Sequence, residues 1–439
     1  MTTKIIVLDD DPTGSQTVHS CLLLMQWDVE TLRLGLRDAA PIFFVLTNTR
    51  ALTPEKATAV TREVCQNLKI ALAAEKIQEY LIVSRSDSTL RGHYPIETDA
   101  IAEALGPFDA HFLIPAFFEG GRITRNSVHY LLVNGVETPV HETEFAKDSV
   151  FGYCHSYLPD YVAEKTQGRI PASQVERFLL PEIRQGCLAH LQALKDNQCA
   201  VVDGETQADL DQFAQAILQA SDQGQHFLFR SAASILTSLA NLGPQPLAAE
   251  AMAKYKPTTA PGAVIVGSHV KKTTEQLANL LQEPGAIGVE IDVTRLRDYP
   301  DQRELLLTKT LEKIKEIHQG NQTPVIYTSR QELAFDTVQK RLDFGLSVSQ
   351  LLMDIVKNLP ANLGFLISKG GITSNDVLST GLSLRSARLL GQVLPGCSVV
   401  RTAPDHPLFP NLPVVLFPGN VGDSQGLATV YRRLALDNP

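Results

Sequence analysis

Short apolar runs alternate with amphipathic stretches along most of this chain, and this alternation limits the fold more than any other feature. Continuous Val/Ile/Leu/Phe runs are typical of parallel strands buried on both faces, and helical patterns between them give the βαβ signature. The expected strands are residues 5–8, 41–46, 80–83, 111–115, 199–202 and 226–229, then 263–266, 287–291, 324–327, 363–367 and 413–416. The sequence therefore predicts an α/β fold with mainly parallel sheets.

The length of 439 residues is too great for one ordinary hydrophobic core. Turn-rich segments at 243–246 and 257–262 interrupt the alternation, which then restarts. We therefore expect two α/β domains, residues 1–245 and 246–439, that face each other across a cleft. The span from about 135 to 190 departs from the alternating pattern and predicts an irregular excursion with a helix.

The composition is that of an ordinary globular protein, with 44% hydrophobic and 20% charged residues. A net charge of −9 argues against a nucleic-acid surface. The six cysteines form no Cys-x-x-Cys pair, which suits a reducing compartment. No apolar run approaches the roughly 20 residues of a membrane span, and the N-terminal run is too short for a signal peptide. We expect a soluble cytoplasmic protein without a membrane partner; the oligomeric state stays open, a homodimer included.

Three consecutive acids, Asp9 to Asp11, end the first apolar run. The carboxyl ends of parallel strands are where open α/β sheets bind ligands. Three like charges at one edge repel one another, so we expect a metal, a cation or a hydrogen-bonded hydroxyl to compensate them. A sharp turn at residues 12–17 adds hydroxyl and amide groups. Taken alone, the stretch fits a solvated acidic turn equally well.

Polar clusters follow two further predicted strands of the first domain. Asp87, Ser88 and Arg91 come after the third strand, and Arg122 comes shortly after the fourth. Arginines can hold a carboxylate through two parallel hydrogen bonds, and hydroxyls suit those of a sugar. A simple ion pair between Asp87 and Arg91 is the alternative for one cluster. Three clusters at one sheet edge favour a small polyhydroxy acid as ligand.

Glycine-bearing turns follow three predicted strands of the second domain. Glycines between strand and helix let backbone amides approach a phosphate closely. Thr373 and Asp376 fit a capping box, which predicts a helix beginning at Thr373. Taken alone, any one of these turns is equally consistent with an ordinary connection between a strand and a helix. The residues concerned are Gly267, Ser268, Gly370, Gly371, Thr373 and Gly419.

Several common motifs are absent from the sequence. There is no Gly-x4-Gly-Lys-Ser/Thr, which excludes a P-loop, and no Gly-x-Gly-x-x-Gly after a strand, so the dinucleotide fingerprint is missing. The eleven histidines form no His-x3-His or His-Glu-x-x-His pattern, so the residues of any metal site remain unknown. Leucines at helical spacing between Pro300 and His318 predict a packing helix.

With these segments placed, the sequence resembles the four-carbon acid sugar kinases, the family of the 3-oxo-tetronate and D-threonate kinases. Six segments occur in the family's order, and residues 142–148 resemble a seventh. The similarity covers nearly the whole chain. The six are 10–14 (Asp-Asp-Pro-Thr-Gly), 87–92 (Asp-Ser-Thr-Leu-Arg-Gly), 115–122 (Pro-Ala-Phe through Gly-Arg), 267–268 (Gly-Ser), 370–374 (Gly-Gly-Ile-Thr-Ser) and 418–422 (Pro-Gly-Asn-Val-Gly).

The resemblance implies an N-terminal domain that binds the acid sugar and a C-terminal domain that binds ATP. It places ATP contacts on Ser268, on Gly370 to Thr373, and on Gly419. Four positions depart from the family pattern: Phe118 replaces a proline, Arg85 a lysine, Ile372 often an aspartate, and Phe417 often a lysine before the last turn. Lys369 is a candidate to supply the charge that the change at Phe417 removes.

We therefore expect an ATP-dependent kinase for a terminal hydroxyl of a four-carbon acid sugar of the threonate, erythronate or 3-oxo-tetronate type. Phosphoryl transfer needs positioning, Mg²⁺ and charge neutralisation more than covalent chemistry. Asp10 or Asp11 would orient or deprotonate the attacking hydroxyl or hold Mg²⁺, and Arg91 and Arg122 would hold the substrate carboxylate. The alternatives are a non-catalytic relative that binds sugar acid or nucleotide and, less favoured without the fingerprint, an NAD-dependent sugar-acid dehydrogenase.

Overall fold

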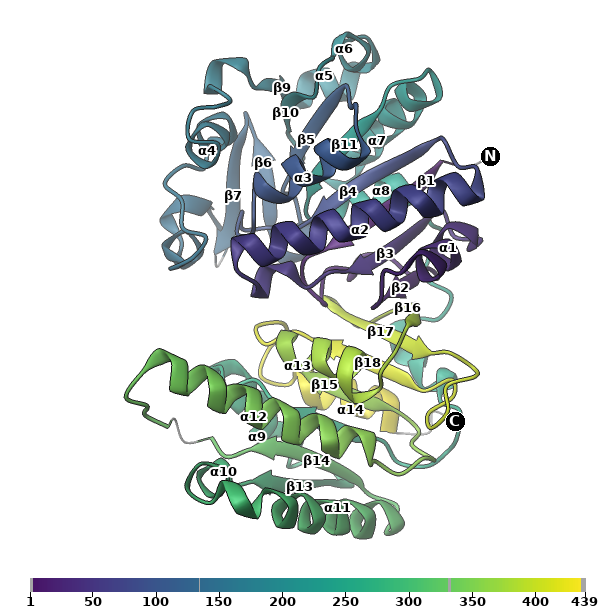
Figure 1. The fold of residues 1–439 in the computed structure, drawn as a ribbon, viewed down its shortest axis with the longest axis vertical. Coiled ribbons are helices and arrows are strands. Elements are labelled where there is room, and N and C mark those ends of the chain that lie inside the picture. The colour runs from purple at the N-terminus through teal and green to yellow at the C-terminus, as the bar shows by residue number, and fades with distance from the viewer. Residues whose placement is uncertain (1–2, 134, 331–332, 436–439) are drawn as a thin grey trace. The chain divides into compact units, whose positions relative to one another are not determined.

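The computed structural model describes residues 3–133, 135–330 and 333–435. The chain divides into two compact units, Met1–Pro244 and Gln245–Pro439. Each unit has a largely parallel sheet with helices packed on it (Figure 1). The α/β class with mainly parallel sheets is therefore confirmed. In the described part of the chain no helix is long and apolar enough to cross a membrane.

The sheet of the first unit has the strand order β2-β3-β1-β4-β11-β5-β10-β9, and every neighbouring pair is parallel. Asp9 at the end of β1 lies beside Leu46 of β3 and Arg85 of β4, so the residues that follow these strands meet at one edge. The strands are β1 (Lys4–Asp9), β2 (Leu22–Leu24), β3 (Ile42–Leu46), β4 (Tyr80–Arg85), β5 (Ala110–Ile114), β9 (Glu176–Phe178), β10 (Gln198–Val202) and β11 (Phe227–Ser231).

Helices cover both faces of this sheet. Residues of α1, α2 and α3 form one apolar core with Ile6 and Leu8 of β1, whereas Phe213 of α7 packs against Phe112 of β5, with ring centroids 5.5 Å apart. The Thr53 side chain caps α2 by accepting a hydrogen bond from the amide of Lys56, and proline follows it as the first helical residue. The helices are α1 (Val29–Arg37), α2 (Pro54–Glu75), α3 (Ile96–Leu105), α4 (Leu158–Lys165), α5 (Leu180–Gln185), α6 (Leu188–Ala193), α7 (Gln207–Asp222) and α8 (Ser234–Ala240), with short 3₁₀ turns η1 (Thr49–Ala51), η2 (Phe118–Gly120), η3 (Val140–Glu142), η4 (Glu144–Lys147) and η5 (Ala172–Gln174).

Between β5 and β9 the chain leaves the parallel sheet. The irregular excursion with a helix expected from about 135 to 190 is partly correct, since α4 and short turns occupy much of it. However, β9 rejoins the parallel sheet within that span, and an antiparallel sheet that the sequence did not predict begins before it. Asn126 and Ser127 both take positive φ, as residues of a tight hairpin turn do. The sheet consists of β6 (Arg122–Arg125), β7 (Val128–Val133) and β8 (Val136–Pro139).

The sheet of the second unit has the order β13-β14-β12-β15-β18-β17-β16. The pairs from β13 to β18 are parallel, whereas β17 pairs antiparallel with both β18 and β16. Lys369 at the end of β15 lies between Val266 of β12 and Phe417 of β18. The strands are β12 (Ala263–Val266), β13 (Ala286–Ile291), β14 (Thr323–Thr328), β15 (Leu366–Lys369), β16 (Ser386–Leu394), β17 (Cys397–Thr402) and β18 (Pro413–Phe417).

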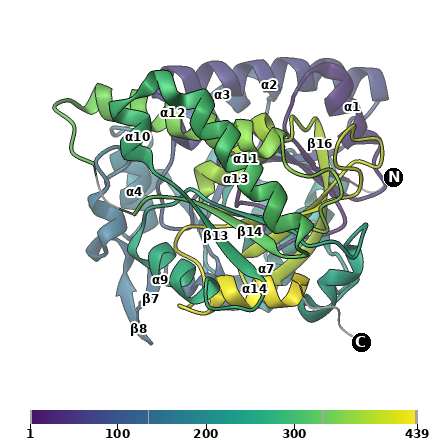
Figure 2. The same cartoon turned by 90° about the horizontal axis from the view of Figure 1, so that it is seen from below.

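Helices also cover both faces of the second sheet. Figure 2 shows α9 and α14 on one side of β13 and β14, and α10, α11 and α12 on the other. The helix expected between Pro300 and His318 is confirmed by the 3₁₀ turn η7 (Pro300–Gln302) followed by α11, but its buried residues are Thr310, Ile314, Ile317 and His318 rather than the leucines from which packing was predicted. The helical elements are α9 (Lys271–Leu280), α10 (Val293–Asp298), α11 (Arg303–Gln319), α12 (Val338–Lys357), α13 (Gly371–Asp376) and α14 (Gly426–Ala435), with the 3₁₀ segment η6 (Ala249–Tyr255) and the π-helical turn η8 (Val377–Gly381).

Two sequence predictions for the second unit were wrong in detail. β15 begins at Leu366, later than the run starting at Leu363 predicts. The capping box does not form, because α13 begins at Gly371 after Gly370, and Thr373 already lies inside the helix. A glycine turn that places the chain in positive φ starts this helix without any side-chain cap.

Candidate functional site

Two arginines compensate the acidic stretch at the end of β1. Arg85, at the end of the neighbouring β4, places Nη1 3.4 Å from Asp9 Oδ1. Arg50, in the turn after β3, binds Asp10 through Nη2 and Nε and places Nη1 3.3 Å from Asp11 Oδ2. Burial opposes the charge of Arg50, but the surrounding carboxylates hold its pKa well above the ordinary value. Of the three compensating groups that the sequence left open, a metal, a cation or a hydroxyl, a cation is thus present in the form of arginine.

Asp10 and Asp11 have different surroundings despite being neighbours. Asp10 is buried, and besides Arg50 its Oδ2 accepts a hydrogen bond of 2.6 Å from the Ser86 hydroxyl. The Asp11 side chain is 24% exposed, and its Oδ1 accepts hydrogen bonds from the amide and the hydroxyl of Thr13. Burial alone would raise the pKa of Asp11, but Arg50 and Arg85 lower it below the usual range. Asp11 is therefore the ionised carboxylate that a ligand can reach.

Asp9 lies beneath this turn and is 1% exposed. Burial, together with the neighbouring charges of Asp10 and Asp11, raises its pKa to about 7 and outweighs the attraction of Arg85. Its Oδ2 is buried and has no hydrogen-bond partner among the residues that the structure describes. These features make Asp9 a structural carboxyl rather than a ligand-contacting one.

A buried network extends from Asp10 across the sheet. Arg230 of β11 donates from Nη2 to the Ser86 hydroxyl at 2.8 Å and from Nη1 to Glu97 of α3 at 2.6 Å. Ser86 in turn donates to Asp10. Each side chain of this network forms a hydrogen bond with the next. The network therefore fixes the position of Asp10 through residues at the ends of three strands and one residue of a helix.

Asp87 and Arg91 form the ion pair that the sequence left as an alternative. Arg91 Nε lies 2.8 Å from Asp87 Oδ2, and its Nη1 lies 3.7 Å from Asp148. The guanidinium also stacks over the Phe145 ring at 5.0 Å. Burial alone would raise the pKa of Asp87, but Arg50 and Arg91 hold it well below its usual range. Arg91 already has two carboxylate neighbours in the chain itself.

Ser88 is less accessible than its place in the polar cluster suggests. Its side chain is buried, and its carbonyl accepts a 2.8 Å hydrogen bond from Nε2 of His129. Burial lowers the pKa of His129 to about 4, so this imidazole is neutral at physiological pH and serves as a structural donor.

Arg122, on β6, differs from the other arginines of this site because it has no ion pair among the residues that the structure describes. Its Nη1 donates to the carbonyl of Gly120, and the guanidinium stands over Phe117 at 5.9 Å. Its Nε is buried and lacks a hydrogen-bond partner in that same part of the chain, and burial lowers the pKa of the group. A guanidinium remains charged even when its pKa is lowered in this way. Arg122 is thus a half-buried cation whose Nε has a donor without a partner in the described residues.

The excursion after β5 supports the turn that carries Asp87 and Arg91. Tyr153 donates its hydroxyl to the carbonyl of Thr89 at 2.7 Å, and Tyr161 donates to the carbonyl of Leu90 at 2.8 Å. Burial raises the pKa of both phenols, so both stay protonated donors. Of the predicted site residues, only Asp87 and Arg91 line a small hollow beside this turn, which is formed by Ser86, Asp87, Leu90, Arg91, Leu113, Pro115, Tyr161, Arg230, Ser231 and Ala232.

In the second unit the three predicted glycine turns converge. A Cβ atom built on Gly267 would lie 2.2 Å from the Thr373 hydroxyl, and one on Gly419 would lie 3.2 Å from the Ser268 hydroxyl. Gly370, with φ of +121°, has Ser268 Cβ 3.0 Å from the position of its missing Cβ. Groups this close leave little room for side chains at the three glycines. The amides of Gly267 and Ser268 bond to the carbonyl of Lys369, and that of Gly370 bonds to the carbonyl of Phe417, which ties the turns together.

Lys369 lies at the centre of these turns and is fully buried. Its Nζ donates to the carbonyl of Pro418 at 2.6 Å and to that of Gly419 at 3.2 Å. The ammonium group also stands 4.0 Å above the Phe417 ring, a favourable cation–π distance. Burial lowers the pKa of Lys369 to about 7.

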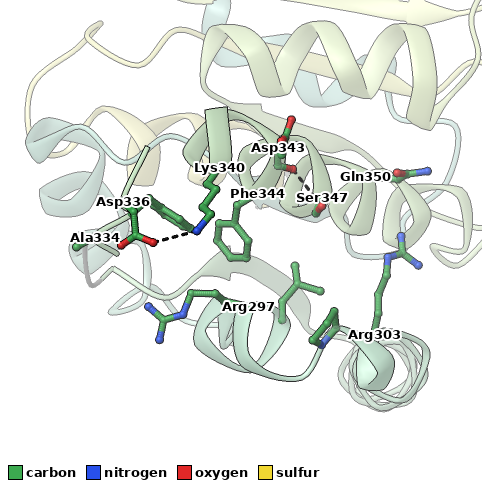
Figure 3. A pocket seen from close by; sticks show the side chains of 12 residues that line it. Arg297, Arg303, Ala334, Asp336, Lys340, Asp343, Phe344, Ser347 and Gln350 are labelled. Carbon is green, nitrogen blue, oxygen red and sulfur yellow. Dashed lines mark hydrogen bonds and ion pairs between the residues drawn. The ribbon is translucent and has the colours of Figure 1, made fainter. Parts of the chain in front are cut away.

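A separate pocket of about 610 Å³ lies beside α10 and the first half of α12 (Figure 3). Phe344 points into it, and Phe335 packs beside that ring with centroids 5.2 Å apart. Lys340, on its rim, pairs with Asp336 at 2.9 Å. None of the residues that the sequence predicts for ligand binding lines this pocket. Within the described residues no three His, Cys, Asp or Glu side chains lie close enough to hold a metal ion together.

Known sequence families match both units. The profile of the sugar-binding N-terminal domain matches residues 5–239, more than half of the chain, and that of the nucleotide-binding C-terminal domain matches residues 263–427. The chain belongs to the four-carbon acid sugar kinase family.

Two named kinases are similar to this family member in sequence. A D-erythronate kinase of Heliobacterium modesticaldum is 27% identical over 67% of this chain and 64% of its own length. A D-threonate kinase of Bordetella bronchiseptica is 30% identical over 35% of this chain and 37% of its own. The chain thus spans less than two thirds of the length of either relative in these matches.

Solved structures share the fold of this four-carbon acid sugar kinase family member. A Salmonella typhimurium LT2 protein superposes with a TM-score of 0.72 at 18% identity, covering 99% of this chain and 98% of the other. A Haemophilus influenzae protein of the DUF1537 family superposes with a TM-score of 0.66 at 16% identity, covering 98% of this chain and 100% of the other. At these identities the likeness shows the fold alone.

Sequence reasoning missed several residues of the first site. Arg50 follows a predicted strand, but no motif marks it, and only the strand order places it beside Asp10. Arg230 lies at the end of the last predicted strand of the first domain, after an apolar run. A charged residue inside such a strand is a usable signal, because a buried charge must be paired.

Proposed function

We propose that this protein is an ATP-dependent kinase that phosphorylates a terminal hydroxyl of a four-carbon acid sugar, of the erythronate, threonate or 3-oxo-tetronate type. The observation that carries the proposal is a pair of complementary sites in a chain of this family. The first unit offers an ionised carboxylate, Asp11, and a cation with a spare donor, Arg122. The second offers closely packed glycine turns around a buried lysine, Lys369. We assign residues 1–245 to the acid sugar and 246–439 to ATP.

Within the first site the residues divide into those that contact substrate and those that position them. Asp11, being partly exposed and ionised, orients the attacking hydroxyl or takes its proton. Asp10, held by Arg50 and Ser86, fixes the turn on which Asp11 stands. Arg122 holds the substrate carboxylate, because Arg91 is already bound to acidic side chains. Asp87 and Ser88 complete the wall around the sugar hydroxyls.

Within the second site the turns at Ser268, at Gly370–Thr373 and at Gly419 bind the phosphates of ATP. Mg²⁺ neutralises phosphate charge in such reactions and usually keeps several waters, with one or two protein carboxylates. Of Asp10 and Asp11, the partly exposed Asp11 would be the one to hold Mg²⁺ in the first unit.

ATP consumption against a panel of tetronic acids tests the proposal. We expect turnover with at least one four-carbon acid sugar that carries a terminal hydroxyl, and none with the matching 4-deoxy acid. Mass spectrometry of the product then shows one added phosphoryl group on the acid. Binding of both ligands without consumption would point to a non-catalytic relative, and acid-dependent NAD reduction would point to a dehydrogenase.

A further inference from the structure

The buried lysine in the nucleotide turns is an unusual feature of the second unit. Lys369 is inaccessible to solvent, and no carboxylate in the described part of the chain forms an ion pair with it. A buried cation without a counter-charge is costly to keep. The fold retains it nonetheless, at the junction of the three turns assigned above to ATP.

The contacts of Lys369 tie these turns together. Its backbone carbonyl accepts hydrogen bonds from the amides of Gly267 at 3.2 Å and Ser268 at 3.3 Å. Its ammonium group donates to two carbonyls of the turn at Pro418 and Gly419. One residue thus bonds the turns after β12 and β18 from its place at the end of β15. An ammonium group has three donors, and two of them are accounted for.

Two further titratable groups act on the lysine. Lys272, at the start of α9, disfavours its positive charge, and the buried thiol of Cys397 on β17 has the opposite influence. Burial is the largest cause of the lowered pKa, which lies near 7 without a ligand. Phe417 offers only its ring face, a weaker partner than a carboxylate.

We propose that Lys369 is the positioning residue of the nucleotide site, which holds the three turns together and whose charge the polyphosphate of the bound nucleotide balances. Nucleotide binding is then coupled to uptake of a proton by this amine. The inference rests on the proposed function and deepens it, because it names the group that replaces the lysine expected at residue 417. An anion beside the ammonium group stabilises its charged form, so the free protein takes up a proton as it binds.

Calorimetric titration with ADP, without metal, tests the coupling in the full-length wild-type protein. At pH 8.5 the phosphates of ADP are already ionised, since a phosphate second pKa is about 6. Titrations in two buffers with different ionisation enthalpies give the number of protons exchanged. We expect uptake approaching about one proton per ADP bound, and less uptake at pH 6, where the lysine is already protonated. Binding without proton uptake at pH 8.5 would overturn the inference and leave the proposed function standing, whereas no ADP binding by the wild type would overturn both.

Lys369→Met assigns the proton to this residue. Methionine is unbranched and adaptable in a core, so we expect the fold to persist, which a retained affinity for the acid sugar verifies independently. The variant should bind ADP about 10-fold or more weakly and show no proton uptake. Lys357→Met, which removes a surface lysine paired with Asp354 in the same unit, is the control and should match the wild type. Unchanged uptake in Lys369→Met would assign the proton elsewhere and overturn the proposal.

Discussion

Adjacent acids with different partners should respond differently to substitution. Asp11→Asn keeps the size of the side chain and removes the charge, and we expect kcat to fall by about 100-fold or more, with little change in thermal stability. The reason is that Asp11 is partly exposed and available to the hydroxyl. Steady-state kinetics together with a melting curve provide the measurement. Near-wild-type turnover would remove Asp11 from the reaction.

Asp10→Ala should act through the fold. It leaves Arg50 and Ser86 without their shared partner in a buried place, and removal of one member of a buried ion pair costs about 3 kcal/mol or more. Chemical denaturation measures this loss. If Asp10→Ala instead kept full stability and lost turnover, Asp10 and Asp11 would exchange the roles proposed here.

Arg122 can be separated from the other cations by a conservative change. Arg122→Lys keeps the charge but loses the planar fork, so we expect KM for the acid sugar to rise about 10-fold or more while KM for ATP stays unchanged. Arg125→Lys on the same strand is the control, because Arg125 is bound to Glu137 and Glu205. An equal rise of both KM values would indicate a structural role for Arg122.

The next prediction concerns the glycine turns of the second unit. Gly370 combines positive φ with close neighbours, whereas Gly224, at φ of +96°, has nothing within 4 Å of the position that a Cβ atom would take. Alanine at either position strains the backbone by about 1 kcal/mol or somewhat more. Only Gly370→Ala also pushes Ser268 and Thr373 apart, so we expect nucleotide affinity to fall about 10-fold or more in this variant alone.

Isothermal titration with ADP and with the acid sugar measures both affinities in each glycine variant. A loss of ADP affinity in Gly224→Ala as well would mean that backbone strain, rather than the shape of the turns, determines binding. Loss of the acid sugar together with ADP in Gly370→Ala would mean that the glycine is needed for folding.

The sequence predicted the strands well because buried parallel strands are continuous apolar runs. The runs at 263–266 and 413–416 correspond closely to β12 and β18. It missed the antiparallel strands β6, β7 and β8, where the apolar pattern is short and partly exposed, and the antiparallel strands β16 and β17. It also missed β2 and β9, parallel strands of only three residues each. Antiparallel strands depend on turn geometry and on the pairing of one strand with another. Neither can be deduced from the hydrophobic periodicity of a single segment.

The candidate sites could likewise be predicted from the sequence only in part. Residues at the carboxyl ends of strands could be placed from the sequence, because strand ends in a parallel sheet share one edge. The partners of these residues were harder to predict. Arg50 beside Asp10 requires the strand order, and the sequence offered the pairing of Arg91 with Asp87 only as an alternative. The accessibility of the two acids could not be predicted from the sequence either, since Asp11 is partly exposed whereas Asp10 is buried.

Across the molecule as a whole, Asp9 makes stability depend on pH. Its folded-state pKa of about 7 lies above the usual 3.8, so folding favours its protonated form. The contribution to stability is therefore full below about pH 4 and is lost as the pH rises toward 7, to an extent on the order of 4 kcal/mol. Asp9→Asn stays neutral, so its stability relative to the wild type should rise across this range.

Urea denaturation at about pH 4, 5.5, 7 and 8 measures the difference. Asp222→Asn, at an exposed position at the end of α7, is the control and should run parallel to the wild type. A constant difference between Asp9→Asn and the wild type at all of these pH values would show that Asp9 is ionised in the folded protein throughout.

The two tyrosines of the excursion have a consequence for how such enzymes diverge and can be redesigned. Tyr153 and Tyr161 hold the carbonyls of Thr89 and Leu90 from a segment that contributes nothing to the parallel sheet. Residues 122–165 therefore lie outside the parallel sheet and support one wall of the acid site proposed above. Recombining this segment between homologues should exchange preference among stereoisomeric acids while the nucleotide requirement is inherited unchanged from the recipient.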